Sequence, residues 1–247
     1  MKSVHSTTQR DRLVKPGWAV AVVFSITLLG VPVFSQAGGG DLAAKFNAIK
    51  ESVARNQQRL HQYQWVETMQ ASVKGSPKPP KQFLCQYGPD GTIQKSPIAP
   101  ESGTQQSPPR GLKGRMVQKK TEELQDYTAQ VKQLLSMYVP PDPQKMQQEF
   151  QDGKVFLNKS AQPGLVNMVF KDYAQPGDEL TLTFNTKTKK LSNVNVNTYL
   201  DKPEDTVTLS TQFGTLPDGT NYTQRTMLNM KAKQLVVNTT NSDYHKL

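Results

Sequence analysis

Short stretches in which apolar and polar residues alternate fill the C-terminal part of the chain, from residue 154 to residue 247. Leu180, Leu182 and Phe184 alternate with polar neighbours, and Val194 and Val196 alternate with asparagines. A period of two residues is typical of β-strands that bury one face and expose the other, as strands of antiparallel sheets commonly do. The pattern predicts an antiparallel meander with strands at 154–158, 165–173, 179–185, 191–200, 206–213, 221–230 and 234–241.

Turn-forming residues separate the predicted strands. The string Pro-Asp-Gly-Thr occurs at 89–92 and again at 217–220. In such a string proline sets the first turn angle and glycine accepts a left-handed position. Before the first of these turns, the alternation at 64–73 and the apolar run at 82–87 predict two more strands. We therefore expect roughly eight to nine strands, enough for a sheet to wrap around helices.

Three segments show the period of an amphipathic helix instead. Helices are expected at 115–139, before a Pro-Pro pair, and at 142–152, where Asp142 is a suitable cap and Pro143 suits the first turn. Another is expected at 41–60, after a possible cap at Asp41. Its apolar residues form one stripe that consists of Leu42, Phe46, Ile49, Val53 and Leu60.

The elements together predict the fold class. Residues 97–115 are rich in proline and glycine, so we expect a flexible loop there. The predicted fold is α+β: a strongly curved antiparallel sheet, or incomplete barrel, with the N-terminal helix and the mid-chain helices packed on its concave side. We expect one such domain over residues 38–247.

The N-terminus has the features of an export signal. Four basic residues within the first 15 precede an uncharged apolar run from Trp18 to Val33, and Ser35-Gln36-Ala37 resembles a cleavage site. This pattern predicts a signal peptide at residues 1–37. The alternative is an uncleaved membrane anchor, although the run is shorter than the about 20 apolar residues that a spanning helix needs.

The charge is basic, with 30 Lys and Arg against 20 Asp and Glu and a net charge of +10. A positive chain favours anionic partners in general terms. One basic segment could contact an anionic membrane surface or simply be solvated, and no aromatic residues interleave with it, which argues against a nucleic-acid groove. Its residues are Arg110, Lys113, Arg115, Lys119 and Lys120.

Motifs for catalysis are missing from the sequence. There is no G-x-S-x-G elbow, phosphate-binding loop or dinucleotide fingerprint, and the three histidines have no metal-ligand spacing. We therefore expect a protein that is not an enzyme and has no cofactor or metal. The single cysteine, Cys85, has no partner for an internal disulfide, and we expect a buried, inert thiol.

Apolar positions remain the best candidates for a working surface. They could line a hydrophobic ligand cavity on the concave side of the sheet, or they could fill an ordinary core, and the sequence is compatible with both. The candidate lining residues are Phe46, Ile49, Val53, Trp65, Met69, Leu182, Phe184, Val194, Val196, Leu209, Phe213 and Met227.

The order of elements from Asp41 to Tyr244 resembles the outer-membrane lipoprotein carriers (LolA/LolB-like). The local likeness lies in the helix-to-strand passage that includes Tyr63-Gln64-Trp65, and in the segment 216–220. Lys78-Pro79-Pro80-Lys81 is only loosely similar to the basic-proline motif of that family, so no single functional residue is carried over.

This resemblance implies an incomplete barrel that holds acyl chains under a helical lid. We accordingly expect an exported, monomeric protein of the bacterial periplasm that binds lipid or an acylated protein and acts as a carrier. The alternative is a ligand-free protein-interaction or sensor module of the cell envelope.

Overall fold

The structure is a computed structural model that describes residues 54–98, 112–188 and 190–247. Residues 54–60 are helical. The other elements are β1 (Tyr63–Val73), β2 (Ser76–Pro77), β3 (Lys81–Tyr87), β4 (Ile93–Pro97), α2 (Leu112–Leu135), α3 (Pro143–Gln151), β5 (Val155–Lys159), β6 (Leu165–Lys171), β7 (Glu179–Asn185), β8 (Lys190–Tyr199), β9 (Thr206–Thr215), β10 (Asn221–Met230), the short helix η1 (Lys231–Lys233) and β11 (Leu235–Lys246).

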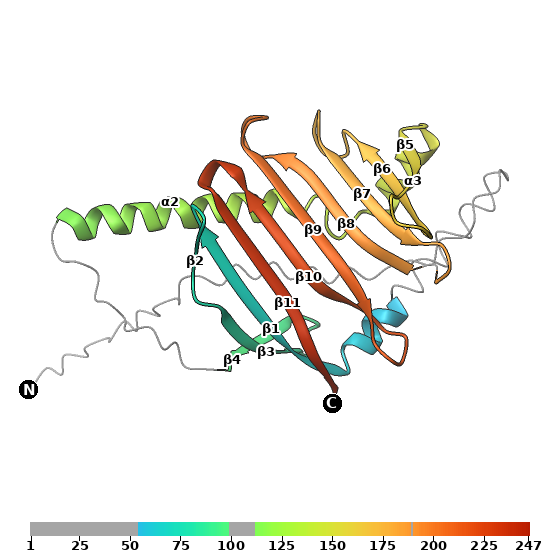
Figure 1. The fold of residues 1–247 in the computed structure, drawn as a ribbon, viewed down its shortest axis with the longest axis horizontal. Helices are drawn as coiled ribbons and strands as arrows, with labels where there is room; N and C mark the ends of the chain where they lie inside the picture. Colours follow the sequence, from blue (N-terminus) through green and yellow to red (C-terminus); the bar gives the residue numbers. More distant parts are fainter. Residues whose placement is uncertain (1–53, 99–111, 189) are drawn as a thin grey trace, which may run out of the picture.

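One antiparallel sheet contains every described strand. Its order is β4-β3-β1-β11-β10-β9-β8-β7-β6-β5, and β2 pairs with β1 as an extra strand. Strands β5 to β11 follow one another in space as they do in sequence, which confirms the predicted meander (Figure 1). The sheet has 11 strands rather than the predicted eight or nine, because the short strands β2 and β4 carry almost no apolar alternation.

The sheet is joined at its middle by the two strands that lie farthest apart in the sequence. β1 pairs with β11 over nearly its whole length, from Tyr63 opposite Lys246 to Val73 opposite Leu235. This pairing adds the N-terminal hairpin strands to the free side of the meander. The described sheet is open, with β4 and β5 at its edges, so the fold is α+β with a curved antiparallel sheet, as predicted.

Local chemistry explains where α3 begins and ends. The Asp142 side chain accepts hydrogen bonds from the backbone N–H of Gln144 at 2.8 Å and of Lys145 at 3.4 Å, and Pro143 occupies the first turn. A cap and an N-terminal proline together favour helix initiation. The helix stops before Gly153, whose φ is +69°. The predicted boundaries of this helix are confirmed.

α2 lies across one face of the sheet and extends past it at its N-terminal end (Figure 1). It begins at Leu112, before the predicted start at 115. Only its C-terminal half is buried: Val131 and Leu135 are fully enclosed, whereas Val117, predicted to share their apolar face, is 50% exposed. The first turns of α2 extend beyond the described strands, which explains why Val117 is not buried against the sheet.

A single core cluster joins the helices to the sheet. It contains residues of α2 and α3, of the segment between them and of β6 to β11. The side chains with the least exposure are Val131, Leu135, Tyr138, Phe170, Tyr173, Leu180, Leu182, Leu191, Val194, Val196, Val207, Leu209, Leu228 and Met230.

Some predicted features fall wholly or partly outside the described residues. These are the leader at 1–37, most of the helix predicted at 41–60, and residues 99–111 of the predicted loop. Residues 54–60 are helical as expected, and Asn56 in this stretch exchanges two hydrogen bonds with the backbone of Asn221 at 2.8 and 2.9 Å. Among the described residues, no helix combines the length and apolar character needed to cross a membrane.

Candidate functional site

Most of the sheet face beneath the helices is filled. Five of the predicted cavity residues belong to the core cluster, where they pack against the helices and one another. Such contacts leave no room for a ligand at these positions. These five residues are Leu182, Phe184, Val194, Val196 and Leu209.

The remaining candidates separate into different places. Phe46, Ile49 and Val53 lie outside the described residues. Phe213 is partly buried against the core.

The placement of Met227 on the concave face is wrong. Its side chain is 43% exposed, because Leu228 and Met230 of β10 are the buried residues and successive side chains of a strand point to opposite faces. Residues 227, 228 and 230 are all apolar, so the local sequence is compatible with either orientation.

Trp65 lies in an aromatic cluster near the start of β1. Its ring stacks on Tyr244 of β11 with centroids 5.6 Å apart, and it meets Tyr87 of β3 at 5.5 Å. Tyr222 extends the cluster through a ring contact with Tyr244 at 4.5 Å. Because Trp65 is only 5% exposed and surrounded by other rings, it contributes to packing rather than to an open cavity.

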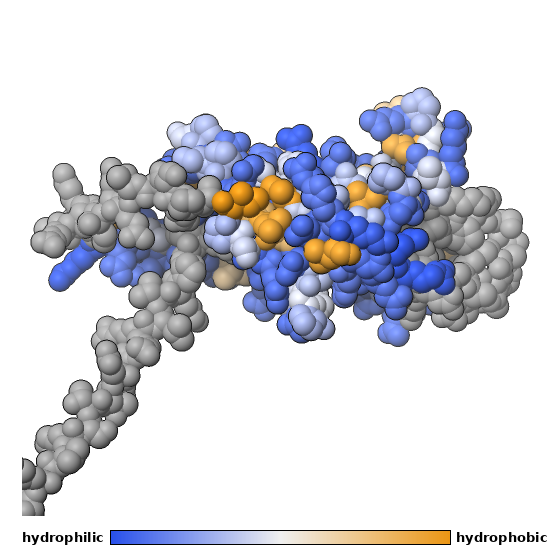
Figure 2. Space-filling model, turned by 90° about the horizontal axis from the view of Figure 1, so that it is seen from below, coloured by the Kyte–Doolittle hydropathy of each residue, from blue (hydrophilic) through white to orange (hydrophobic). Residues whose placement is uncertain are grey.

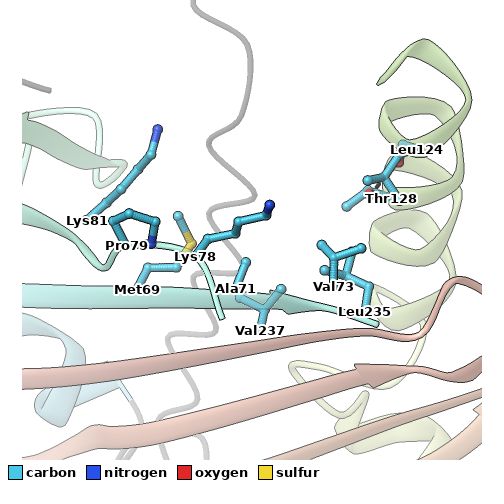
Figure 3. A pocket seen from close by; sticks show the side chains of 10 residues that line it. All are labelled: Met69, Ala71, Val73, Lys78, Pro79, Lys81, Leu124, Thr128, Leu235 and Val237. Atoms are coloured by element: carbon cyan, nitrogen blue, oxygen red, sulfur yellow. Dashed lines mark hydrogen bonds between the residues drawn. The ribbon is translucent and has the colours of Figure 1, made fainter. Parts of the chain in front are cut away.

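An apolar pocket does occur farther along β1. Its volume is about 390 Å³, near the lower end of the about 300–1,000 Å³ that is common for small-molecule sites. Figure 3 shows β1 and β11 on one side of it and α2 on the other. The lining residues are Met69, Ala71, Val73, Lys78, Pro79, Lys81, Leu124, Thr128, Leu235 and Val237.

The pocket exists because α2 stops making close contact with the sheet at this point. Val131 is fully enclosed, Leu124 two turns earlier is only partly buried, and Val117 is exposed. The described residues therefore leave the space between helix and sheet unfilled around Leu124 and Thr128.

Seen from below in Figure 2, the surface is mostly polar with separate apolar patches.

The floor of the pocket consists of small and aliphatic side chains. Ala71 faces Val237 across the β1–β11 pair, and Val73 faces Leu235. Ala71 has no side-chain atom beyond Cβ, so the middle of this floor projects little into the pocket. The Thr128 hydroxyl offers the pocket no donor, since its proton is used in a hydrogen bond to the Leu124 carbonyl at 2.6 Å.

The rim of the pocket is formed by the connection from β2 to β3. The backbone N–H of Lys78 donates to the Ala71 carbonyl at 2.7 Å, and the Gln70 side chain donates to the Lys78 carbonyl at 3.3 Å. These bonds hold the Lys78-Pro79 stretch against the end of β1. Among the described lining residues, Lys78 and Lys81 are the only charged ones, so this part of the pocket is apolar inside and has lysines at its rim.

Sequence reasoning identified Met69 as a lining residue and missed most of the others. Ala71 and Val73 share the face of Met69 by strand alternation, so the period of β1 could have indicated them. Lys78 and Pro79 had only a loose likeness to a basic-proline motif, and no local signal points to the partner residues on α2. Their position depends on how distant segments meet.

A buried ion pair lies on β1 between the pocket and the aromatic cluster. Lys95 on β4 contacts Glu67 with 2.5 Å between Nζ and Oε1, and both side chains are largely buried. Cys85 on β3 is completely enclosed beside them. Burial, reinforced by the negative charge of Glu67, raises the pKa of the Cys85 thiol to about 12. The sulfur is therefore protonated near neutral pH and is a poor nucleophile.

The other candidate features are metal-ligating side chains and the basic segment at residues 110–120. Among residues 54–98, 112–188 and 190–247, no group of three or more His, Cys, Asp or Glu side chains could hold a metal ion. Of the basic segment, Arg115, Lys119 and Lys120 are exposed on the first turns of α2, and Arg110 lies outside the described residues.

Comparisons with known proteins add little to this geometry. Neither a protein-family model nor a curated protein matches the chain. Among solved structures, the crystal structure of a DUF1329 family protein from Desulfovibrio piger is similar at 9% sequence identity and a TM-score of 0.38, over 83% of this chain and 90% of that chain. Similarity this weak bears on neither the fold nor the function of the present chain.

Proposed function

We propose that this protein is an exported, non-enzymatic carrier of the cell envelope that holds the aliphatic chain of a lipid or acylated protein. The observation that carries the proposal is the pocket between β1, β11 and α2, whose inner lining is almost entirely aliphatic. The pattern at residues 1–37, typical of a signal peptide, supports export.

The physical basis of binding is removal of an alkyl chain from water. Each buried methylene contributes about 0.8 kcal/mol, which corresponds to roughly a fourfold gain in affinity. No covalent step is needed, so binding is reversible. The volume of about 390 Å³ suits one short or medium chain better than several.

Release would follow contact with a membrane. The exposed Arg115, Lys119 and Lys120 lie in the N-terminal half of α2, the helix whose first turns extend beyond the sheet. Basic side chains are attracted to anionic lipid headgroups by about 1 kcal/mol each near the surface. They would bring the pocket, which opens beside the same helix, close to a lipid acceptor.

Calorimetric titration with a series of linear alcohols from six to fourteen carbons tests the proposal. Affinity should rise by about fourfold per methylene until the pocket is full, and then level off. Absence of binding across the whole series, together with native mass spectrometry that finds no lipid on protein purified from its own envelope fraction, would refute the proposed function.

A protein-interaction module is the second candidate, and one observation favours it. β5 is an edge strand, and Phe156 and Leu157 within it are 49% and 50% exposed. Unpaired edge strands with exposed apolar residues readily accept a further strand. If the pocket binds no alkyl chain, β5 is the first surface to test for a partner.

A further inference from the structure

We propose that the ligand is a single-chain anionic amphiphile, with its alkyl chain in the pocket and a negatively charged oxygen group, such as a carboxylate, beside Lys78. This inference rests on the proposed function, because it names the chemistry of the ligand for the same pocket. The proposed function names only the alkyl chain, whereas this inference also specifies the group attached to it. That group is an anionic headgroup and not the neutral end of an acylated polypeptide.

The arrangement of the two lysines is the first observation behind it. In Figure 3 both side chains rise from the β2–β3 side, and their ammonium groups point away from the sheet. Met69, Ala71 and Val237 lie below them along the strands. A lysine can cover apolar surface with its stem while its charge stays in water, so the same residues close the pocket and mark its polar end.

The chemistry of the described lining residues, and of Lys78 among them, is the second observation. None of the ten lining residues is acidic. Lys78 is exposed, and within the part of the chain that the structure describes its hydrogen bonds are made by its backbone rather than by its ammonium group. A cation at the end of an apolar pocket matches a ligand that carries its one negative charge at the end of its chain.

The α2 side of the pocket carries a further lysine. Lys120 lies one turn before Leu124 and therefore on the same helix face, with an exposed side chain. Glu122 and Asp126 lie nearly on the opposite side of the helix by the 100° step between residues. Lysines thus border the pocket on two sides, and on the α2 side Glu123, 100° from Leu124 and three residues after Lys120, places a carboxylate beside that lysine.

The pocket volume limits the kind of anionic lipid. A cavity of about 390 Å³ accommodates a ligand with one chain more readily than a two-chain phospholipid. Free fatty acids and single-chain phosphates share the required chemistry, which is an anionic oxygen group on one alkyl chain. We expect the carboxylate to bind best, because its small head can approach Lys78 without crowding Pro79.

The test compares headgroups on one chain. Dodecanoate, dodecyl phosphate, dodecanol and dodecyltrimethylammonium are titrated calorimetrically below their micelle concentrations, against the full mature protein. An exposed ion pair is expected to make dodecanoate bind about two- to fivefold tighter than dodecanol, and the advantage should shrink at high salt. Dodecyl phosphate distinguishes single-chain phosphates from free fatty acids. Tighter binding of dodecyl phosphate than of dodecanoate would exclude the carboxylate as the preferred headgroup.

Two variants and a matched control assign the effect to one residue. Lys78→Gln should abolish the preference for dodecanoate over dodecanol, and Lys78→Glu should make dodecyltrimethylammonium the better ligand. Lys159→Gln removes the same charge from β5 at the far edge of the sheet and should change nothing.

The two hypotheses fail in different ways. Equal affinity for all four headgroups, or a preference that survives Lys78→Gln, would overturn this inference and leave the proposed function intact. If none of the four ligands binds, the proposed function fails and this inference fails with it.

Discussion

The hydroxyl of Tyr138 donates a hydrogen bond to the buried carboxylate of Asp178, and this contact joins the segment after α2 to the turn between β6 and β7. The same carboxylate accepts hydrogen bonds from the backbone N–H groups of Tyr173, Ala174 and Gln175 at 2.5, 2.9 and 2.8 Å. Burial and this hydrogen bond raise the pKa of Tyr138 above its ordinary value, so the hydroxyl remains a donor. One side chain therefore organises a turn and fixes the helical layer to the sheet.

Changes at this contact should lower the free energy of unfolding. Tyr138→Phe removes a hydrogen bond to a charged group and should cost about 1.5–3 kcal/mol. Asp178→Asn should cost more, because in either orientation its amide N–H₂ would replace an oxygen that accepts at least one backbone N–H group. Urea denaturation with a common slope measures both.

A matched control uses the same chemical change at an exposed site. Tyr199→Phe removes a hydroxyl that donates to the Pro176 carbonyl at 2.9 Å on the exposed side of the same turn. Its cost should be about 0.5 kcal/mol, at the low end for a solvent-exposed hydrogen bond. Equal losses for Tyr138→Phe and Tyr199→Phe would show that the buried contact with Asp178 has no special role.

Filling the pocket should abolish ligand binding without unfolding the protein. Ala71→Leu places a larger side chain on the low floor opposite Val237. Alkyl-chain affinity should fall at least tenfold in calorimetry. The free energy of unfolding should stay constant or rise by about 1 kcal/mol, as cavity-filling substitutions often do. Ser72→Leu puts the same side chain on the opposite face of β1 and should leave binding unchanged.

Gly219→Val should destabilise the β9–β10 hairpin. Gly219 has a φ of +84° in the turn, where its N–H donates to the Leu216 carbonyl at 2.9 Å. A side chain would meet nothing within 4 Å, so the cost comes from backbone strain alone, about 1–2 kcal/mol for an L-residue in this conformation. Gly219→Asn should cost less, since asparagine tolerates left-handed angles. An unchanged melting temperature for the valine variant would contradict the strain argument.

Cys85 should be unreactive in the folded protein. With a pKa near 12, its thiolate fraction at pH 8 is on the order of a thousandfold below that of an unfolded thiol. Iodoacetamide should modify Cys85 rapidly in urea and very slowly in buffer, as followed by mass spectrometry. Rapid alkylation of the native protein would mean that this side chain is accessible.

The same thiol should make the fold sensitive to alkali. The folded state keeps the Cys85 proton, whereas the unfolded state releases it above the ordinary pKa of a thiol. The contribution of Cys85 to the free energy of unfolding is therefore fully present below the ordinary thiol pKa and is lost as the pH rises toward 12. Cys85→Ala removes the titrating group and should give a shallower decline between pH 9 and 11.

Local features could be predicted from the sequence because they depend on neighbouring residues. The alternation at 179–185 and at 221–230 matches β7 and β10 residue for residue. Asp142 caps α3, and the Pro-Asp-Gly-Thr turns place Gly91 and Gly219 at positive φ. A strand period, a helix cap and a turn each involve only a few consecutive positions, so each can be recognised before any tertiary contact is known.

The candidate site depended on contacts between distant segments, which no local period contains. Only the pairing of β1 with β11 brings Ala71 beside Val237, and only the path of α2 beyond the sheet leaves the space at Leu124 open. For the same reason Leu182 proved to be in a filled core, and Met227 pointed to the outer face. The apolar positions, and the longer strands and helices that contain them, could be predicted from the sequence alone. The tertiary structure decided which of them are packed and which border a cavity, because packing depends on the distance between a helix and a sheet.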